Sequence, residues 1–273
     1  MARVLITGCN SGFGLGAARM FAERGDRVYA TVRDSERAEE LTALADGGLP
    51  ITILEFDVRD AARAGEIVAQ VLDEGGIDAL VNNAGVSMFA AVEEVSVDRV
   101  KEMMEVNLYG PLRLIQLVLP TMRRQRRGRI VNVSSGAGLV PIGYMSTYSM
   151  TKHALDALSF CTAVEVAPYG VKVSIVAPGA FGTAVGGKLW SPDIDVDAPE
   201  YRKTANALVA GWFTSVEGRH PDVVSQVIVD AVHAENPSIR ILAGDDMLAI
   251  AKLRRDCTDD QWLDHMLPND VWA

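Results

Sequence analysis

The chain has 273 residues, of which 49% are hydrophobic, and this is enough to form one sizeable α/β domain. Its net charge of −10 argues against nucleic acid or an anionic membrane as a partner, and no apolar run is long enough to span a bilayer. The first residues lead directly into an expected strand, so we expect no signal peptide. Cys9, Cys161 and Cys257 are far apart and lack metal-ligand spacing, so we expect reduced thiols in a cytoplasmic protein.

A glycine-rich turn follows the first expected strand. Residues 3–7 form a short apolar run typical of a buried strand, and an amphipathic helix is predicted from about Gly12 to Arg24. Gly8, Gly12 and Gly14 have the spacing Gly-x-x-x-Gly-x-Gly. Such a turn lets backbone N–H groups and the helix N-terminus approach a pyrophosphate. The alternative is a tight turn that merely requires glycine.

The second expected strand runs from Val28 to Val32 and is followed by Arg33. In dinucleotide-binding folds this strand end contacts the adenosine ribose, with a carboxylate for NAD or an arginine for the 2′-phosphate of NADP. Val32 stands where the carboxylate is expected and Arg33 follows it, so the sequence favours NADP(H) over NAD(H). The alternative is a surface arginine that pairs with Asp34 or Glu36.

A polar helix and a third strand come next. Ser35 is predicted to cap the helix, which reaches about Ala45, and the strand covers residues 51–56. Asp57-Val58 follows directly, at the carboxyl edge where ligands bind in open α/β sheets.

The fourth strand ends in a cluster of side-chain amides. A helix over 61–72 leads to a strand over 79–81, and Asn82-Asn83-Ala84-Gly85 follows. Two amides and a glycine at this place can brace neighbouring strands and let a cofactor lie close. The alternative, that the asparagines only stabilise the sheet, can hold alongside the functional interpretation.

A long helical region is predicted over 96–127, with Asn107, Gly110-Pro111 and Pro120 interrupting it. Such interruptions predict a local kink that frees a backbone carbonyl. Residues 112–119 are apolar on nearly every face, which indicates burial by the chain's own sheet or by another subunit.

The fifth expected strand, over 129–133, precedes Ser134-Ser135-Gly136 and a helix that carries Tyr148 and Lys152. At a spacing of four, the two side chains share one helix face. A phenol has a pKa near about 10, and an ammonium group a few Å away favours the phenolate, so we expect Lys152 to lower the pKa of Tyr148. A tyrosine tuned in this way can exchange a proton with a carbonyl or alcohol oxygen. The alternative is an ordinary helix with a packed ring and a solvated amine.

The last third of the chain continues the alternation of expected strands and helices. A sixth strand over 171–176 ends in Ala177-Pro178-Gly179, and a helix over 222–234 with a strand over 239–243 forms a seventh β unit. Between them, residues 184–218 are expected to form a variable substrate-binding lid, and residues 245–273 a C-terminal tail that packs on the domain. The alternation predicts a doubly wound (Rossmann) seven-stranded parallel sheet with helices on both faces, in a single domain over 1–273.

The ordered motifs resemble those of the short-chain dehydrogenase/reductase family over nearly the whole chain. The matching segments are Thr7-Gly8-x-x-x-Gly12-x-Gly14, Asp57-Val58, Asn82-Asn83-Ala84-Gly85, Asn107, Ser135, Tyr148-x-x-x-Lys152, and Pro178-Gly179 with Thr183. Ser135 lies thirteen residues before Tyr148, which is the family's usual interval. Residues 26–34, 220–222 and 237–244 look closest to the branch of 17β-hydroxysteroid and retinol dehydrogenases, and this suggests a lipophilic alcohol or ketone.

The resemblance implies a role for each matching residue. Tyr148 would be the general acid/base, and Lys152 would lower its pKa and bond the nicotinamide ribose. Ser135 would hydrogen-bond the substrate oxygen, and Asn107 would hold a water in a proton relay to Lys152. The implied cofactor site comprises Thr7, Gly8, Asn10, Ser11, Gly12, Phe13, Gly14, Arg33, Asp57, Val58, Asn83, Ala84, Gly85, Tyr148, Lys152, Pro178, Gly179, Phe181 and Thr183. Because Ser11 replaces the basic residue of one NADP-type branch, the NADP preference rests mainly on Arg33.

Together these features predict an NADP(H)-dependent oxidoreductase that interconverts a secondary alcohol and a ketone. Two alternatives stay open: a catalytically idle NADP(H)-binding sensor or scaffold, and a reductase of aldehydes or sugar-like substrates. The resemblance also implies a homodimer or homotetramer, since family members pair through the helices that precede and carry the tyrosine. The four histidines show no metal spacing, so we predict no metal.

Overall fold

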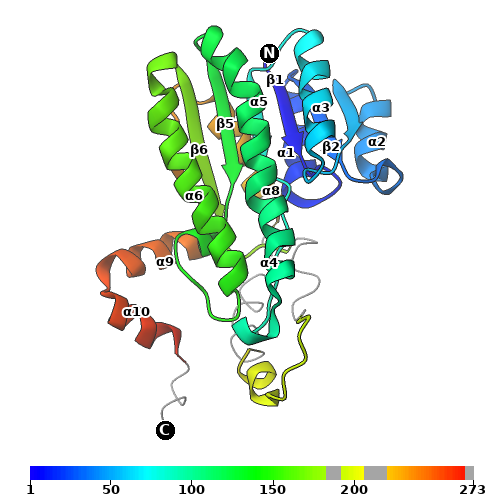
Figure 1. Cartoon of the computed structure of the whole chain (residues 1–273). Coiled ribbons are helices and arrows are strands. Elements are labelled where there is room, and N and C mark those ends of the chain that lie inside the picture. The colour runs from blue at the N-terminus through cyan, green and yellow to red at the C-terminus, as the bar shows by residue number, and fades with distance from the viewer. Residues whose placement is uncertain (183–191, 206–219, 268–273) are drawn as a thin grey trace.

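The computed structural model describes residues 1–182, 192–205 and 220–267. Within them, seven parallel strands form one sheet in the order β3-β2-β1-β4-β5-β6-β7 (Figure 1). Their bounds are β1 (Arg3–Thr7), β2 (Arg27–Val32), β3 (Ile51–Glu55), β4 (Ala79–Asn82), β5 (Gly128–Val133), β6 (Val171–Pro178) and β7 (Arg240–Ala243). The strand order reverses between β1 and β4, and the carboxyl ends of strands at such a point form a ligand-binding crevice. The predicted doubly wound, single-domain architecture is confirmed.

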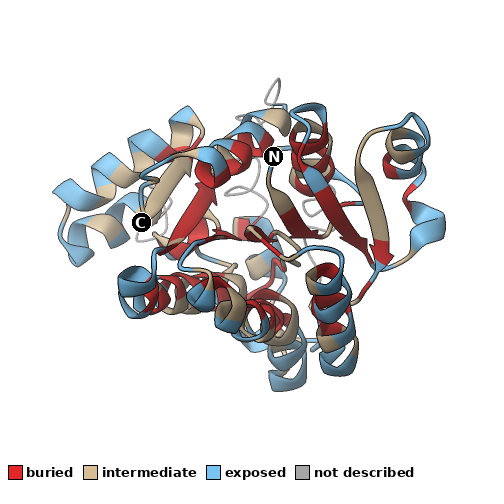
Figure 2. Cartoon of the chain, turned by 90° about the horizontal axis from the view of Figure 1, so that it is seen from above, coloured by how far each residue is buried: buried red, intermediate tan, exposed pale blue. Residues whose placement is uncertain are grey.

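Helices cover both faces of the sheet, which lies as a mostly buried layer between them (Figure 2). One face packs against α1 (Gly12–Glu23), α2 (Glu39–Asp46) and α8 (Asp222–His233), and the other against α3 (Ala61–Asp73), α5 (Gly110–Arg124) and α6 (Ser146–Val166). Successive strand residues alternate between the two cores: Val4 and Ile6 belong to the first and Leu5 to the second. Both cores are apolar, as burial on both faces of a parallel sheet requires.

The helix that we predicted to begin at Ser35 is divided in two. Asp34, rather than Ser35, provides the cap: its carboxylate accepts a hydrogen bond from the Glu36 N–H and starts a 3-10 turn, η1 (Ser35–Arg37). Ala38 then leaves the helical region with φ −116° and is buried, and α2 begins only after it. The helix is therefore interrupted at the buried Ala38, where the sequence alone shows a continuous polar pattern.

The kink that we predicted near Asn107 is a π-turn. The helix α4 (Val97–Met104) passes into η3 (Glu105–Tyr109), which adds one residue to the turn before α5 begins. Such π-turns shift backbone carbonyls out of the regular helical ladder and occur frequently at functional sites. Pro120 lies inside α5 and does not end it.

The C-terminal part of the chain leaves the sheet. Most of the predicted lid, with Trp190 and Trp212, lies outside the described residues, whereas 199–205 are helical. The tail forms α9 (Asp245–Asp256) and α10 (Asp259–Met266), which extend away from the sheet in Figure 1. In these two helices Met247 is the buried residue, and Leu263 is 57% exposed. The start of α9 is therefore anchored by one buried side chain, and packing of the tail on the domain stays a prediction.

Among the described helices, none has both the length and the hydropathy that a bilayer-spanning segment needs.

Candidate active site

The turn after β1 is packed so closely that glycine is required. A Cβ atom on Gly8 would lie 2.8 Å from the Ala84 Cα, and one on Gly14 would lie 2.3 Å from the Gly8 carbonyl oxygen. Gly8 also has a φ of +75°, which strains other residues. Ser11 precedes α1 and makes no capping hydrogen bond with its side chain, so the first N–H groups of the helix are left for another acceptor. This cradle fits a pyrophosphate.

The asparagines at the carboxyl end of β4 brace the sheet. The Thr7 hydroxyl accepts hydrogen bonds from the backbone N–H groups of Asn83 and Ala84, at 3.1 and 3.0 Å. The Asn83 side chain donates to the carbonyls of Thr7 and Gly8, at 2.9 and 3.0 Å. Asn82 donates to Asn132 at 2.8 Å inside the sheet. These hydrogen bonds agree with the structural interpretation of the amides, and those of Asn83 also fix the glycine-rich turn in place.

Charged residues meet at the ends of β2 and β3. Arg33 is exposed and forms no ion pair within the described part of the chain, because Asp34 pairs with Arg37 instead, at 3.1 Å. Asp57 is bound by Arg59 at 2.7 Å, and the guanidinium groups of Arg59 and then Arg33 lower the pKa of Asp57. The Arg33 guanidinium is thus available to an anion at the place where dinucleotide folds hold the adenosine ribose.

Asn107 has its side chain fully engaged. Its amide oxygen accepts from the Val86 N–H at 2.9 Å, and its nitrogen donates to the Val86 carbonyl at 2.8 Å and to Thr151 at 3.0 Å. The side chain therefore ties the π-turn to the end of β4 and to α6. Both N–H donors of this amide are used, and a water relay through Asn107 stays a prediction.

Lys152 lies almost completely buried between α6 and β5. It is 4% exposed, and its ammonium group donates to the Val133 carbonyl at 2.9 Å. Its Nζ atom lies 5.8 Å from the centre of the Tyr148 ring. Burial lowers the pKa of Lys152 to about 8, and the negative charge of Asp156 opposes this shift.

Tyr148 and Ser135 face each other across the site. Burial raises the pKa of Tyr148, and a hydrogen bond from the Ser135 side chain opposes that increase. The net direction is opposite to the lowered pKa that we expected for Tyr148, because burial outweighs the opposing groups. The Lys152 ammonium donates to the Val133 carbonyl, and its effect on the Tyr148 pKa stays a prediction. In this arrangement Tyr148 is protonated at neutral pH and can donate a proton.

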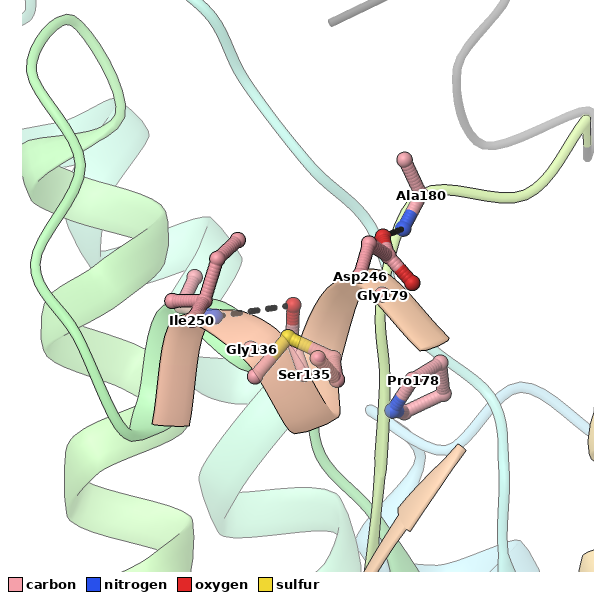
Figure 3. A pocket seen from close by; sticks show the side chains of 9 residues that line it. Ser135, Gly136, Pro178, Gly179, Ala180, Asp246 and Ile250 are labelled. Atoms are coloured by element: carbon pink, nitrogen blue, oxygen red, sulfur yellow. Dashed lines mark hydrogen bonds between the residues drawn. The ribbon is translucent and has the colours of Figure 1, made fainter. Parts of the chain in front are cut away.

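A small cavity of about 80 Å³ opens beside Ser135. The segment after β5 contributes Ser135 and Gly136, the end of β6 and the loop after it contribute residues 178–180, and α9 contributes Asp246 and Ile250 (Figure 3). The remaining lining residues are Ala137 and Met247. Five of the nine lining residues (Ala137, Pro178, Ala180, Met247 and Ile250) carry apolar side chains, so the cavity suits a largely apolar group next to a hydroxyl donor.

The loop after β6 is clamped by α9. The Asp246 carboxylate accepts a hydrogen bond from the Ala180 N–H at 2.8 Å (Figure 3). A Cβ atom on Gly179 would lie 2.2 Å from that carboxylate, so only glycine fits. On the other side, the ring of Phe181 lies 5.8 Å from that of Phe13, edge to face, and joins this loop to the glycine-rich turn.

Two acidic residues were missed in the sequence analysis. Asp246 had a local signal, since it follows Gly244 at the start of a helix directly after the last strand. Asp156 also had one, because it lies one helical turn after Lys152 on the same face.

The structure brings most of the predicted residues to the carboxyl edge of the sheet. Thr183 lies outside the described residues, and its predicted role is not addressed. Asn10 and Ser11 are exposed on the glycine-rich turn, and a Cβ atom on Gly85 would lie 3.7 Å from the Lys152 Nζ. In the described part of the chain no three histidine, cysteine or acidic side chains gather as a metal site would require.

Known proteins share both the sequence and the fold. A model of the short chain dehydrogenase family matches residues 2–193. The chain is 32% identical over 243 residues to the 3-ketodihydrosphingosine reductase of Bacteroides thetaiotaomicron, covering 88% of this chain and 87% of the relative. It is 33% identical over 265 residues to the 17-beta-hydroxysteroid dehydrogenase type 1 of Mus musculus, covering 93% and 76%. The crystal structure of a metagenomic short-chain oxidoreductase in complex with NADP is similar with a TM-score of 0.70 and 26% identity, over 89% of this chain and 96% of that one.

Proposed function

The chain belongs to the short-chain dehydrogenase/reductase family, and we propose that it is an NADP(H)-dependent oxidoreductase that interconverts a secondary alcohol and a ketone. The observation that carries the proposal is the convergence of Tyr148, Lys152 and Ser135, of which Ser135 also lines an apolar cavity. A proton donor, a buried cation and a hydroxyl in one place provide what carbonyl reduction needs from a protein.

The residues around the crevice fit a dinucleotide. The turn from Gly8 to Gly14 would hold the pyrophosphate, Asp57 and Val58 would flank the adenine, and the loop at Pro178-Gly179 would border the nicotinamide. When bound, the nicotinamide supplies or accepts the hydride at the carbon of the substrate.

The protein's own part in the reaction is to hold and move a proton. In the reductive direction Tyr148 gives its proton to the carbonyl oxygen, and its raised pKa keeps that proton available at neutral pH. Ser135 donates a hydrogen bond to the same oxygen as negative charge develops on it. The Lys152 ammonium stabilises the phenolate that remains on Tyr148.

Arg33 supports a preference for NADP(H) over NAD(H). It is exposed after the end of β2 and forms no ion pair with the residues that the structure describes, so it can bind the 2′-phosphate without breaking one of them. A structural relative binds NADP, which agrees with this choice.

The substrate is proposed to be bulky or lipophilic. The cavity beside Ser135 has apolar walls from α9 and from the loop after β6. Next to the start of α6, the rings of Phe89 and Tyr144 stack at 6.1 Å, and Tyr201 meets Tyr144 edge-on at 6.2 Å. One relative acts on hydroxysteroids according to its name, in agreement with an apolar substrate.

We also propose a homodimer or homotetramer. Exposed apolar side chains occur on α5 and α6, including Leu117, Phe160 and Val164, of which Val164 is 77% exposed. Both helices lie on one face of the molecule in Figure 1. Light scattering is expected to give at least twice the mass of one chain, and a monomer mass would rule the proposal out.

A substrate screen tests the function. The purified protein is mixed with NADPH, or with NADH, and with bulky ketones, steroid ketones, retinal or small aldehydes, and cofactor oxidation is followed by absorbance. We expect turnover of some bulky ketones, faster with NADPH. If NADPH binds but no compound is turned over, the result favours the sensor interpretation, and turnover of aldehydes alone favours the aldehyde reductase.

A further inference from the structure

Lys152 carries its ammonium group in a buried position, where the loss of water disfavours the charged form. Its side chain is 4% exposed, and its ammonium group has the Val133 carbonyl as a hydrogen-bond acceptor. Taking an ammonium group out of water is costly, and the pKa of about 8 shows that it loses its proton close to the physiological range. A neutral amine would lack the positive charge that stabilises the phenolate of Tyr148. Some feature of the fold must therefore keep Lys152 charged.

Asp156 has the position that this task requires. It lies one turn after Lys152 along α6, so the two side chains share a face, and it is itself only 4% exposed. Among the described residues its Oδ1 atom has no hydrogen-bond partner. The carboxylate thus acts on Lys152 through its charge, in a region from which water is largely excluded.

Arg240 holds Asp156 from the other side. Its guanidinium group, at the start of β7, forms an ion pair with the Asp156 carboxylate across 84 residues of sequence. The same guanidinium lies 5.4 Å from the centre of the Phe160 ring, one turn further along α6. Burial raises the pKa of Asp156, and Arg240 is among the groups that oppose this. Without that cation, a buried carboxylate would tend to become neutral.

The turn η4 (Gly136–Gly138) closes this region. A Cβ atom on Gly138 would lie 2.7 Å from the Ser134 hydroxyl, 3.0 Å from the Asp156 carboxylate and 3.1 Å from the Lys152 carbonyl. Any side chain at Gly138 would push these groups apart. The backbone that follows Ser135 therefore packs directly on the Lys152–Asp156 turn of α6.

Few charged groups face Lys152 from the elements around it. Within the described residues, α6 presents Tyr148 and Asp156, and β7 presents Arg240 behind Asp156. The strand β5 presents the uncharged Val133 carbonyl, and η3 lies nearby with the uncharged Asn107 amide. Asp156 is thus the anion that balances Lys152.

We propose that Asp156, held by Arg240, is a positioning residue that keeps Lys152 in its ammonium form for the proposed reaction. The inference rests on the proposed function for its catalytic consequence, but the charge pairing itself is a property of the fold. Asp156 touches neither the substrate nor the cofactor in this account and acts only through Lys152.

The first test is a pH profile of kcat for the wild type and for Asp156→Asn, with a ketone found in the screen. Loss of a nearby opposite charge lowers a lysine pKa by about 1 unit or more, so the alkaline limb of the profile is expected to move to lower pH by that amount. At pH 7.5 this reduces kcat by about threefold, while kcat at pH 6 stays near the wild-type value. Asp156→Glu is expected to restore most of the alkaline limb. An unchanged alkaline limb in Asp156→Asn would overturn the proposal.

Two further variants keep this test decisive. Asp78→Asn removes a carboxylate that binds Arg3 at 2.8 Å at the amino ends of the central strands β1 and β4, and it is expected to leave the alkaline limb in place. If Asp156→Asn does not fold, the double variant Asp156→Asn/Arg240→Gln removes the ion pair as a whole and leaves no Arg240 charge without its partner. Because loss of the Arg240 cation itself favours the Lys152 ammonium, the alkaline limb is expected to move in the same direction by a smaller amount, and an unchanged limb would overturn the proposal.

The second test does not depend on turnover. Denaturant unfolding at pH 7 without cofactor is measured for the wild type, Lys152→Met, Asp156→Asn and the double variant of these two. The proposal predicts that the effects are not additive, with a favourable coupling of about fivefold or more in the unfolding equilibrium constant. Additive effects would overturn it. A failure to reduce any ketone, with the coupling present, would count against the proposed function alone.

Discussion

Replacing Lys152 by methionine is expected to stabilise the protein while it removes the proposed activity. The pKa of Lys152 lies at about 8 in the folded protein and at 10.5 when unperturbed. Below pH 8 the folded chain must carry a charge that burial disfavours. Between pH 8 and 10.5 the unfolded chain binds more protons than the folded one, so stability rises with pH through this window.

The magnitude follows from the size of this shift. A pKa lowered from 10.5 to about 8 corresponds to a cost of about 3 kcal/mol at neutral pH. Methionine removes that cost but leaves the buried Val133 carbonyl without its donor, which offsets about 1 kcal/mol. We therefore expect Lys152→Met to be about 2 kcal/mol more stable than the wild type at pH 7.

Denaturant unfolding of the protein without cofactor measures this difference at pH 7 and at pH 10. The gain is expected to fall to about zero at pH 10, where the wild-type lysine is mostly neutral in the folded state. Lys101→Met is the matched control, since Lys101 is exposed on α4 in a surface ion pair, and it should change stability by less than about 0.5 kcal/mol at either pH. A Lys152→Met protein that is less stable at pH 7, or a gain that does not depend on pH, would refute the reasoning.

Three further substitutions test other parts of the structure. Arg33→Ala should weaken NADPH binding by about tenfold or more and leave NADH binding unchanged, as measured by fluorescence titration. An equal loss of affinity for both cofactors would contradict the role of Arg33. Gly179→Ala places a Cβ atom 2.2 Å from the Asp246 carboxylate and should weaken NADPH binding. Gly143→Ala is the control, because a Cβ atom there has no other atom within 4 Å, and it should leave NADPH binding unchanged. Equal NADPH affinities in the two variants would argue against the clamp of the loop by Asp246. Gly65→Ala lies in α3 with open space around it and should raise stability by about 0.5–1 kcal/mol in thermal unfolding, and a lower melting temperature would contradict this.

The sheet could be predicted because its strands are short apolar runs at regular intervals. Val4-Leu5-Ile6 illustrates why: a strand buried on both faces needs apolar residues at every position, and this is visible without any tertiary information. The break at Ala38 could not be predicted in this way. It depends on the competition between Asp34 and Ser35 as caps and on the burial of Ala38, which only the folded structure decides.

In the candidate site too, some features could be predicted from the sequence and others depend on the folded structure. Tyr148, Lys152 and Ser135 were found because spacing along a helix and position after a strand are properties of the sequence. The pairing of Asp156 with Arg240 spans 84 residues, and that of Ala180 with Asp246 spans 66. The local sequence shows where the two acidic residues stand, but it does not show which distant partner each one meets. The direction of the pKa shift of Tyr148 was also missed, because burial dominates it and the sequence does not show burial.

The most direct test of the proposed mechanism is the rate of NADPH oxidation by Tyr148→Phe with the best ketone of the screen. NADPH affinity is measured by fluorescence on the same samples. Phenylalanine keeps the ring and removes only the hydroxyl, so we expect NADPH affinity within about twofold of the wild type and a turnover lower by about 10²–10⁴-fold. Turnover near the wild-type rate would show that Tyr148 is not the proton donor and would contradict the mechanism.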